Sequence, residues 1–220
     1  GSWSVLLFSF IAGLIYAKAG MNLKAVALFS GLSLLINSKQ ALVIAIRLKR
    51  AGAFTVFAIQ IITGLLILLM TDPELLRLYP FGVIPMIYLL SFLIYGEHGL
   101  LTEIAGFLIL CLASLIVHFS FTDEINAGLY VAVSLFFIAG VFKVRVQLKR
   151  GLRERFMMVF YLLSSVLAFL LMHINPLLLL PLTENLLFSL TLYRVKLKVT
   201  GWIEVLKGLA FLVLIYLSGL

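Results

Sequence analysis

Residues 127–155 read AGLYVAVSLFFIAGVFKVRVQLKRGLRER, an apolar stretch that runs directly into a cluster of bases. The part before Lys143 carries no charge, whereas the part from Lys143 to Arg155 is the densest run of charge in the chain. A long apolar segment that ends in lysine and arginine is typical of a membrane-spanning helix with a cytoplasmic basic end. A second such end, Arg47-Leu48-Lys49-Arg50, closes an earlier apolar stretch.

The amino-acid composition of the whole chain is also that of a membrane protein. Hydrophobic residues make up 64% of the 220 residues, charged residues 12%, and the mean hydropathy is +1.21. A soluble domain has about 45–50% apolar and about 25% charged residues, so a soluble fold is excluded. The sequence therefore predicts an all-α polytopic membrane protein with about nine transmembrane helices. We expect the spans at about 3–16, 25–47, 53–70, 81–95, 100–119, 127–142, 156–172, 177–193 and 202–217.

The connections between these spans alternate in charge. One set contains the bases at 47–50, 143–155 and 194–198, and the other contains Asp72, Glu74, Asp123 and Glu124. The positive-inside rule then places the first set and the N-terminus in the cytoplasm of a multi-pass protein. The net charge of +8 is explained in the same way, so we expect membrane lipids as partners and no nucleic acid.

An internal repeat organises the spans. The segment SLL at 33–35, ahead of LKR at 48–50, recurs as SLF at 134–136, ahead of LKR at 148–150. Further matches in the same order pair Pro80 and Pro85 with Pro176 and Pro181, Tyr95 with Tyr193, and Glu103 with Glu204.

The repeat divides a single transmembrane domain, residues 1–220, into repeat 1 at about 1–95, repeat 2 at about 99–193 and an extra helix at about 201–219. An even number of helices per repeat makes the two halves parallel, related by an axis along the membrane normal. Both basic turns then face the cytoplasm, and we expect a central cavity that opens there.

Charged and amide side chains inside apolar spans are the candidate functional residues, because a charge in hydrocarbon costs about 2.5–3.5 kcal/mol even on the lenient insertion scale. Glu103 and Glu204 have the alternative of pairing with a lysine or arginine of a neighbouring turn at the membrane interface. The bases have the alternative of marking topology and contacting anionic lipid, but arginine also binds phosphate with two hydrogen bonds. The predicted ligand-binding residues are Asn37, Lys39, Gln40, Arg47, Glu103, Lys143, Arg145, Glu184 and Arg194.

Motifs of soluble-enzyme chemistry are absent from the sequence: it has no glycine-rich phosphate loop, no cysteine pair, no HExxH and no nucleophile elbow. We therefore assign no catalytic residue and expect no metal site and no cofactor. The single cysteine, Cys111, lies inside an apolar run and is predicted to be a packed thiol.

Four segments resemble the YwiC-like family of prokaryotic membrane proteins: GSWSVLLFSFIAGL at 1–14, GEHGLLTEIAGFL at 96–108, VFKVRVQLKR at 141–150 and VTGWIEVLKGLAF at 199–211. The resemblance implies the inner membrane of a prokaryote. Members of that family start with a Lys-(Glu/Gln)-His-Gly-Ala-Trp element, of which only Gly1-Ser2-Trp3 is matched here.

More distantly, nine helices built from two four-helix repeats resemble the UbiA-type intramembrane prenyltransferases. Those enzymes carry Asp-rich motifs that hold Mg²⁺ on a prenyl diphosphate, at places where this chain has NSKQ at 37–40 and GVFKVR at 140–145. A Mg²⁺ pair needs carboxylates. Neither 37–40 nor 140–145 contains an aspartate, which argues against ordinary prenyl transfer. Lys143 and Arg145 would instead neutralise a phosphate directly.

The sequence therefore favours a UbiA-like protein whose cytoplasm-facing basic cavity binds an anionic lipid or an isoprenoid phosphate. Two other classes stay open: a transporter or permease for a small anion, and an assembly subunit of a membrane complex. Whether the protein catalyses a reaction is left open as well.

Overall fold

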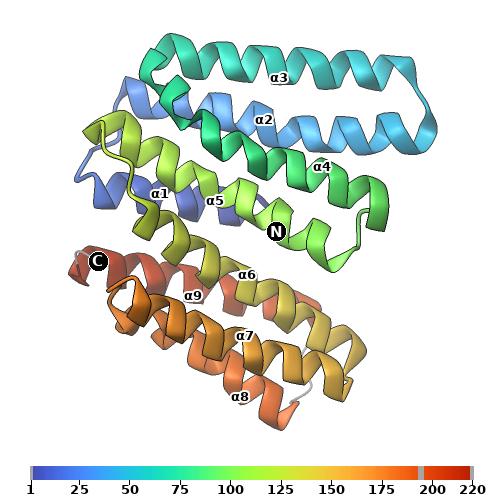
Figure 1. Ribbon diagram of the computed structural model, residues 1–220, viewed down its shortest axis with the longest axis vertical. Coiled ribbons are helices and arrows are strands. Elements are labelled where there is room, and N and C mark those ends of the chain that lie inside the picture. Colours follow the sequence, from blue (N-terminus) through green and yellow to red (C-terminus); the bar gives the residue numbers. More distant parts are fainter. Residues whose placement is uncertain (1, 193–195, 219–220) are drawn as a thin grey trace.

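The chain folds into helices joined by short turns (Figure 1). The structure is a computed structural model that describes residues 2–192 and 196–218. Within these residues every regular element is a helix. The elements are α1 (Ser2–Tyr16), α2 (Leu23–Leu48), α3 (Ala51–Thr71), η1 (Pro73–Gly82), α4 (Val83–Tyr95), α5 (Leu100–Thr122), α6 (Ala127–Lys149), α7 (Leu152–Leu171), η2 (Pro176–Leu182), α8 (Thr183–Thr191) and α9 (Leu197–Ser218), where η denotes a 3-10 helix.

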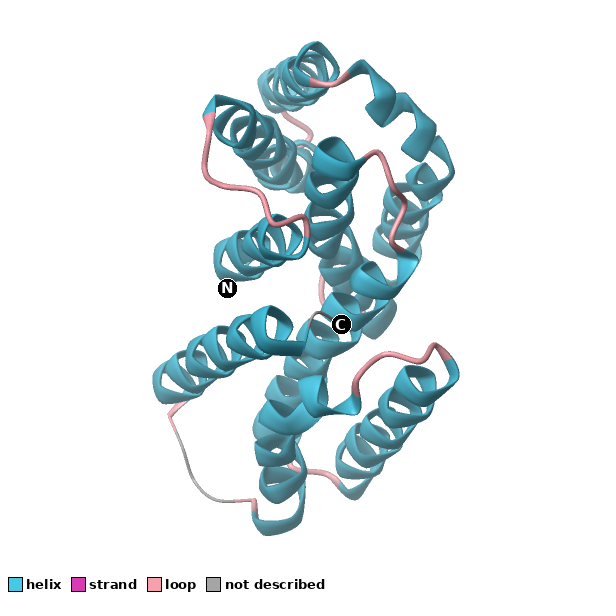
Figure 2. Ribbon diagram, turned by 90° about the vertical axis from the view of Figure 1, so that its left-hand side faces the viewer, coloured by secondary structure: helices cyan, strands magenta, loops and turns pink. Residues whose placement is uncertain are grey.

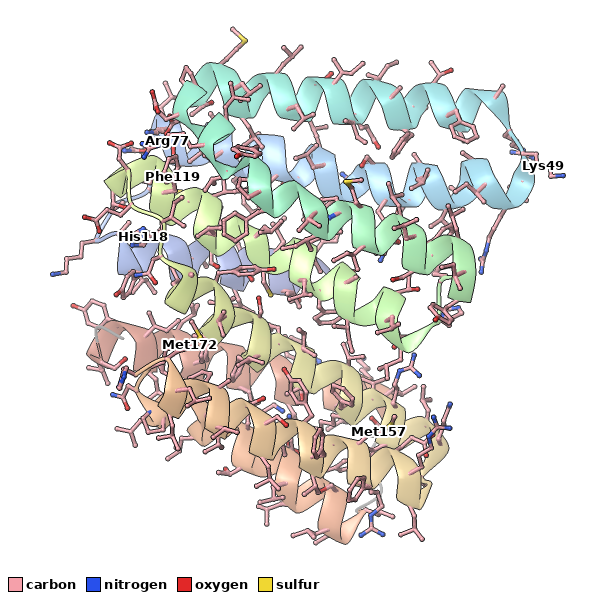
Figure 3. All side chains as sticks on the ribbon, in the orientation of Figure 1. Lys49, Arg77, His118, Phe119, Met157 and Met172 are labelled. Atoms are coloured by element: carbon pink, nitrogen blue, oxygen red, sulfur yellow. The ribbon has the colours of Figure 1, made fainter. Side chains whose placement is uncertain are left out.

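The helix axes run roughly side by side, so that Figure 2 looks along them. In Figure 1, α1 to α5 form the upper part and α6 to α9 the lower part. The turn at Lys49 and the region of Met157 lie at one end of the helices, and Arg77, His118 and Met172 lie toward the other (Figure 3). We call the first the basic end. Grouping of the basic turns at one end agrees with the alternation of charge read from the sequence.

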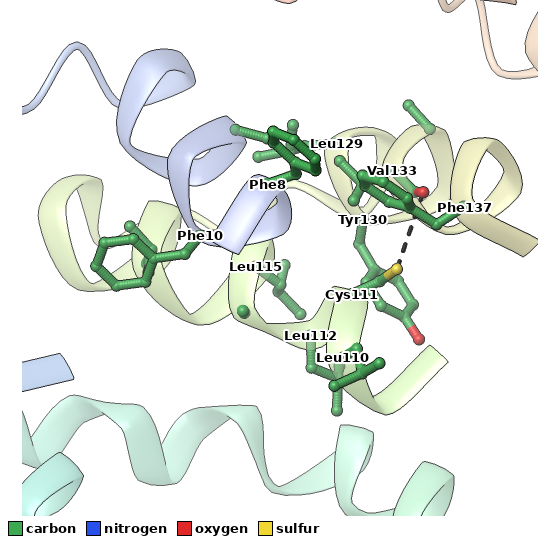
Figure 4. Packing of buried hydrophobic residues seen from close by; sticks show 14 of the residues in the cluster. Phe8, Phe10, Leu110, Cys111, Leu112, Leu115, Leu129, Tyr130, Val133 and Phe137 are labelled. Carbon is green, nitrogen blue, oxygen red and sulfur yellow. Dashed lines mark hydrogen bonds between the residues drawn. The ribbon is translucent and has the colours of Figure 1, made fainter. Parts of the chain in front are cut away.

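Helices α1, α5 and α6 supply the main core (Figure 4). Gly13 of α1 lies so close to α5 that a Cβ placed there would be 2.7 Å from the carbonyl oxygen of Ser114. Cys111 is fully buried in this core, and its thiol lies 3.9 Å from the carbonyl oxygen of Val133 on α6. Close approach through small residues is the usual way in which helices associate in membranes.

Helices α2 and α3 form a hairpin that packs through the facing residues Gly31 and Gly64. A Cβ on either glycine would lie 3.0 Å from the carbonyl oxygen of the other. Gly64 and Leu68 are the buried residues of α3, and much of its remaining apolar surface is exposed. In a bilayer this exposed surface faces lipid.

Proline shapes the two short connections before α4 and α8. Each 3-10 helix begins at a proline, Pro73 in η1 and Pro176 in η2, and the preceding Asp72 or Asn175 side chain accepts a hydrogen bond from the backbone. Pro80 and Pro181 lie inside these 3-10 helices. Pro73 thus begins η1 as Pro176 begins η2, whereas the repeat predicted from the sequence pairs Pro80 with Pro176.

Seven helical segments are long and apolar enough to cross a membrane, among the residues that the structure describes. Helix α1, with 15 residues, and the segment Pro176–Thr191 are shorter. A 3-10 helix rises about 2.0 Å per residue against about 1.5 Å in an α-helix, so Pro176–Thr191 extends about 28 Å, close to the thickness of a hydrocarbon core. Helix α1 extends only about 22 Å. The predicted nine spans thus correspond to seven long spans and two shorter apolar segments.

At the end opposite the basic end, Lys24, Asp72 and Ser120 join the start of α2, the end of α3 and the end of α5. Lys24 Nζ lies 3.1 Å from Asp72 Oδ2 and also donates to the Ser120 carbonyl, while Ser120 Oγ donates to Asp72 Oδ2 at 2.6 Å. Burial alone would raise the pKa of the Asp72 carboxyl, but the hydrogen bonds from Ser120 and Lys24 and the charge of Lys24 outweigh it, so the pKa lies below its ordinary value.

Candidate functional site

Four charged side chains from α6, α8 and α9 form a closed ring of ion pairs, which we call the Lys–Glu ring. Lys143 Nζ lies 2.6 Å from Glu184 Oε2 and 3.0 Å from Glu204 Oε1. Lys207 Nζ lies 3.1 Å from that same Glu184 oxygen and 2.5 Å from that same Glu204 oxygen. Lys207 also donates a hydrogen bond to Asn185 Oδ1.

The two lysines of the ring are buried and the two glutamates are partly exposed. The side chains of Lys143 and Lys207 are 1% and 7% exposed, whereas those of Glu184 and Glu204 are 27% and 29% exposed. Two positive and two negative charges leave the ring neutral. Buried charges are tolerated when they are paired in this way, so neither lysine has a free charge to offer a ligand unless a carboxylate moves.

Local structure brings the ring residues together. The 3-10 helix η2 ends at Leu182, which places Glu184 in the first turn of α8. Glu204 and Lys207 are three residues apart on α9 and therefore lie on the same helix face. Arg155 of α7 holds the far end of α8, because its Nε donates to the Ser189 carbonyl at 2.6 Å. Such side-chain donors satisfy the carbonyls that are left unpaired at a helix end.

A second group of charges lies nearer the basic end of α2, α5 and α6. Arg145 lies 2.8 Å from Glu103 Oε2 and donates to the carbonyl of His98 at 2.8 Å. Arg47 lies 3.1 Å from Glu97 Oε2. Lys143 and Arg145 are therefore near neighbours on α6 that take different partners.

Lys39 belongs to this second group but forms no ion pair with any residue that the structure describes. The charges of Glu97 and Glu103 act on it electrostatically, and its ammonium lies over the ring of Tyr88, 5.2 Å from the centroid. A Cβ built on Gly106 would be 3.6 Å from Lys39 Nζ. Lys39 thus differs from Lys143 and Lys207, each of which contacts two carboxylates.

A hollow of about 120 Å³ lies at the basic end between α5, α6 and α7, and we call it the basic hollow. Three bases and one acid line it together with apolar side chains. Its lining residues are Leu100, Phe142, Arg145, Lys149, Arg153, Glu154 and Met157. The combination of bases and apolar walls fits an amphipathic anion.

A wider groove of about 510 Å³ runs between η2 and α9 on the outer surface. Its walls are almost wholly apolar, and Lys207 is its one charged lining residue. Because Lys207 is engaged with the Lys–Glu ring, this groove presents mainly hydrocarbon-contacting surface.

The remaining predicted residues are placed as follows. Gln40 is exposed and Asn37 is half-buried, both on a face of α2 that also carries the exposed Ser30 and Ile44. Neither amide has a hydrogen-bond partner within the described ranges. Arg194 lies outside the described residues. The structure therefore joins Lys143 with Glu184, and Arg145 with Glu103, but it does not bring all the predicted bases into one cluster.

Sequence reasoning missed Lys207 and the aromatic Tyr88. Lys207 lies near the start of the last apolar stretch, and its spacing of three from Glu204 is a signal that the sequence offers. Tyr88 gave no such signal, because an aromatic residue in an apolar helix is ordinary. Its contact with Lys39 depends on how α2 packs near α4 and α5.

The fold and these sites define a class: an all-α protein with seven helical segments suited to cross a bilayer and with paired charges inside them. Among residues 2–192 and 196–218, no three His, Cys, Asp or Glu side chains come close enough to hold a metal ion. Comparisons with protein-family models, with curated proteins and with solved structures give no match.

Proposed function

We propose that this chain binds the phosphate headgroup of an anionic membrane lipid or an isoprenoid phosphate in the basic hollow. The observation that carries the proposal is the lining of that hollow. Arg145, Lys149 and Arg153 supply positive charge, and Leu100, Phe142 and Met157 supply apolar contact surface. A lipid phosphate needs both, because its headgroup is anionic and its chain is hydrocarbon.

Two of the three bases that line the hollow, Lys149 and Arg153, can exchange partners readily. Lys149 lies 3.7 Å from Glu154 with its side chain 60% exposed, and a surface pair of this kind is worth about 0–1 kcal/mol. Arg153 is exposed and has no partner among the described residues. Each lysine or arginine near an anionic membrane surface contributes about 1 kcal/mol of attraction. A phosphate therefore competes readily for these two side chains.

We place the basic end in the cytoplasm of a prokaryote, in the inner membrane, with the N-terminus on the same side. The support is the grouping of the basic turns at one end and of the acidic turns that follow α3 and α5 at the end of Arg77 and His118 (Figure 3), as the positive-inside rule requires.

We also propose that the fold arose from two parallel four-helix repeats with a UbiA-like arrangement, as expected for a relative of the YwiC-like family. The order of elements supports a duplication: three α-helices, a proline-led 3-10 helix and a short α-helix occur twice, before and after Gly99, and α9 follows. The α-helices that carry the basic turns, α2 and α6, occupy the same place in the two halves.

The test uses two matched charge changes at the basic end. The chain is reconstituted in nanodiscs that contain phosphatidylcholine with a minor fraction of phosphatidylglycerol, and retained lipid is read by native mass spectrometry. We expect Lys149→Gln/Arg153→Gln to lose the retained phosphatidylglycerol. Lys49→Gln/Arg50→Gln, which removes the same charge from the other basic turn, should keep it. If both variants lose phosphatidylglycerol equally, its retention depends only on the total surface charge, and the proposal is contradicted.

The Lys–Glu ring favours a second candidate, a transporter for a small anion. Partly exposed carboxylates around buried lysines form a pair network that can open when an anion replaces a carboxylate. The measurement is flux of radiolabelled phosphate or chloride into proteoliposomes. Uptake that the charge-balanced Lys143→Met/Glu204→Gln variant abolishes while it stays folded, and that Lys149→Gln/Arg153→Gln leaves intact, would favour transport over lipid binding.

A further inference from the structure

One side of α2 is left uncovered by the helices that the structure describes. Gly31 packs on α3, and Lys39 reaches Gly106 of α5. Phe29 meets Phe10 of α1, with the ring centroids 5.1 Å apart. The remaining side carries residues that are exposed or half-buried, and we call it the open face of α2. Its residues are Val26, Ser30, Ser33, Asn37, Gln40 and Ile44.

The open face carries amides in the middle of a membrane-spanning helix. Asn37 lies near the centre of α2, and Gln40 follows it by one turn. Neither amide has a hydrogen-bond partner among residues 2–192 and 196–218, and the enclosed Ser33 Oγ has none either. Hydrocarbon offers no hydrogen bond in place of water, so an amide that faces lipid at this depth is unfavourable.

The exposed face of α9 shows how a lipid-contacting face is composed in this protein. Leu206, Leu209 and Val213 are all exposed, and they follow one another at spacings of three and four residues. The open face of α2 has the same spacings, but serines and amides occupy its central positions. Contact with lipid therefore accounts for the face of α9 and leaves the amides of α2 unexplained.

The open face follows the spacing of a coiled-coil seam. From Val26 to Ile44 the steps along it alternate between four and three residues, which is the a and d pattern of a heptad. The helix rises about 27 Å over these residues, close to the thickness of about 30 Å of a hydrocarbon core. Helices with this pattern pack side by side in membranes at a crossing angle of about 20°. The open face thus fits a second helix along the full depth of the bilayer.

A second copy of this chain has the chemistry that the open face needs. Two copies inserted in the same direction are related by a two-fold axis along the membrane normal, so their α2 helices are parallel and like residues meet at the same depth. An amide carries both donors and an acceptor, so Asn37 can pair with its counterpart in the second copy, and Gln40 with its own.

The charges also permit this pairing. The open face has no charged residue from Val26 to Ile44, so two copies meet there without repulsion. Arg47, the next residue in the same spacing, lies 3.1 Å from Glu97 and so has its charge paired within its own chain. The face is therefore complementary to itself.

We propose that two copies of this chain form a parallel dimer in the membrane through the open face of α2, with Asn37 and Gln40 hydrogen-bonded across the two-fold axis. Asn37 takes an a position of the heptad, where a polar asparagine fixes the register and the number of helices in a coiled coil. The basic hollow lies between α5, α6 and α7, so the dimer leaves it uncovered and does not depend on the proposed function.

Dimer formation is measured by energy transfer between donor-labelled and acceptor-labelled copies in phosphatidylcholine liposomes. The label is attached to Glu124→Cys in a Cys111→Ala background, and energy transfer should fall as lipid is added. We expect Asn37→Leu/Gln40→Leu to weaken the dimer about tenfold or more, because the hydrogen bonds between the two helices are lost. The control is Thr63→Val, which removes an exposed hydroxyl of α3 outside the open face and should leave the dimer unchanged.

Disulfide cross-linking locates the interface independently. In the Cys111→Ala background, Ile44→Cys places a thiol on the open face and Leu66→Cys places one on α3. The parent residues are similarly exposed, at 46% and 53%, so exposure alone does not favour either position. Under mild oxidation we expect a covalent dimer with Ile44→Cys and none with Leu66→Cys.

Three results would overturn the proposal. The first is a protein that stays monomeric at every lipid dilution, or a double variant that dimerises as well as the unmodified chain. The second is cross-linking through Leu66→Cys without cross-linking through Ile44→Cys, which would place the contact on α3. The third is native mass spectrometry of detergent-extracted membranes that shows a fixed complex with a different protein in place of a second copy.

The melting temperature at high dilution, where the protein is monomeric, separates loss of the dimer from loss of the fold. Asn37→Leu/Gln40→Leu should then be at least as stable as the unmodified protein, since leucine replaces amides that face lipid without a partner. A lower melting temperature would show that the amides are paired within their own chain, and the proposal would be wrong.

Discussion

Lys143 and Lys207 bind the same two oxygen atoms, Glu184 Oε2 and Glu204 Oε1, from opposite helices of the lower part of the molecule. Each ammonium bridges α8 and α9, and Lys143 also fixes both to α6. The ring therefore acts as a three-helix connection, and Thr200 Oγ1 of α9 adds a hydrogen bond to Gln147 Oε1 of α6 at 2.9 Å.

Removing one lysine from this ring should be strongly destabilising. Lys143→Met leaves two carboxylates facing a single ammonium, and breaking a buried ion pair in this way costs about 3–5 kcal/mol. We expect a clear fall in the melting temperature of the purified protein, measured by loss of the monodisperse species on heating. The exposed Lys198→Met on α9 should change it little.

The same reasoning predicts partial rescue by a second change. Lys143→Met with Glu204→Gln removes one charge of each sign and leaves Lys207 paired with Glu184. The double variant should be more stable than Lys143→Met alone. If the two losses simply add, the ring residues do not act as a coupled unit.

The Asp72 carboxyl should make stability depend on pH. Its pKa in the folded protein lies below the ordinary value of 3.8, so its ionised form stabilises the fold at neutral pH. That contribution is complete above the ordinary pKa and is lost as the pH falls through the lower, folded value. The melting temperature should therefore drop on acidification below pH 4, measured as a pH series in one detergent.

Asp72→Asn should be less stable than the unmodified protein at pH 7, and the difference should shrink at the acid end of the series. Asp123→Asn is the matched control, because Asp123 is exposed and adopts a left-handed conformation that asparagine tolerates. A constant difference at every pH would show that Asp72 stabilises the fold by some means other than its charge.

Two glycines should respond in opposite ways to the same substitution. Gly13→Ala places a methyl group against the backbone of α5, 2.7 Å from the Ser114 oxygen, and should cost about 1–3 kcal/mol through overpacking. Gly201→Ala on α9 meets nothing within 4 Å and should be neutral or stabilising by about 0.5–1 kcal/mol. Thermal unfolding of both variants under one condition checks the contrast.

Labelling with a membrane-impermeant thiol reagent tests the orientation. In a Cys111→Ala background, we expect Glu124→Cys to react from the outside of intact cells and Arg50→Cys to react only after the membrane is permeabilised. Both parent residues are exposed. The reverse pattern would invert the proposed topology. Native Cys111, which is fully buried, should stay unreactive until the protein unfolds.

The sequence alone determined the class of protein, the number of apolar segments and the alternation of charge between their ends. These follow from local properties: apolar length decides what crosses a bilayer, and the bases at 47–50 and 143–155 mark one side whatever the packing. It also singled out Lys39, Lys143, Glu103 and Glu184, because a charge in an apolar helix is costly wherever its partner lies.

Helix ends were less well predicted. Helix α6 continues to Lys149 and so carries Lys143 and Arg145 on regular helix, while the eighth segment divides at Leu182 because two prolines favour a 3-10 turn.

Only the tertiary structure decided which charges meet. Lys143 and Arg145 are two residues apart, yet one faces α8 and α9 and the other faces α5, because successive positions on a helix point in different directions. No local pattern could show that Glu97 and Glu103 would be taken by arginines and that Lys39 would be left beside Tyr88. Such pairings depend on contacts between helices far apart in the chain, and packing of small residues such as Gly13, Gly31 and Gly64 sets those contacts.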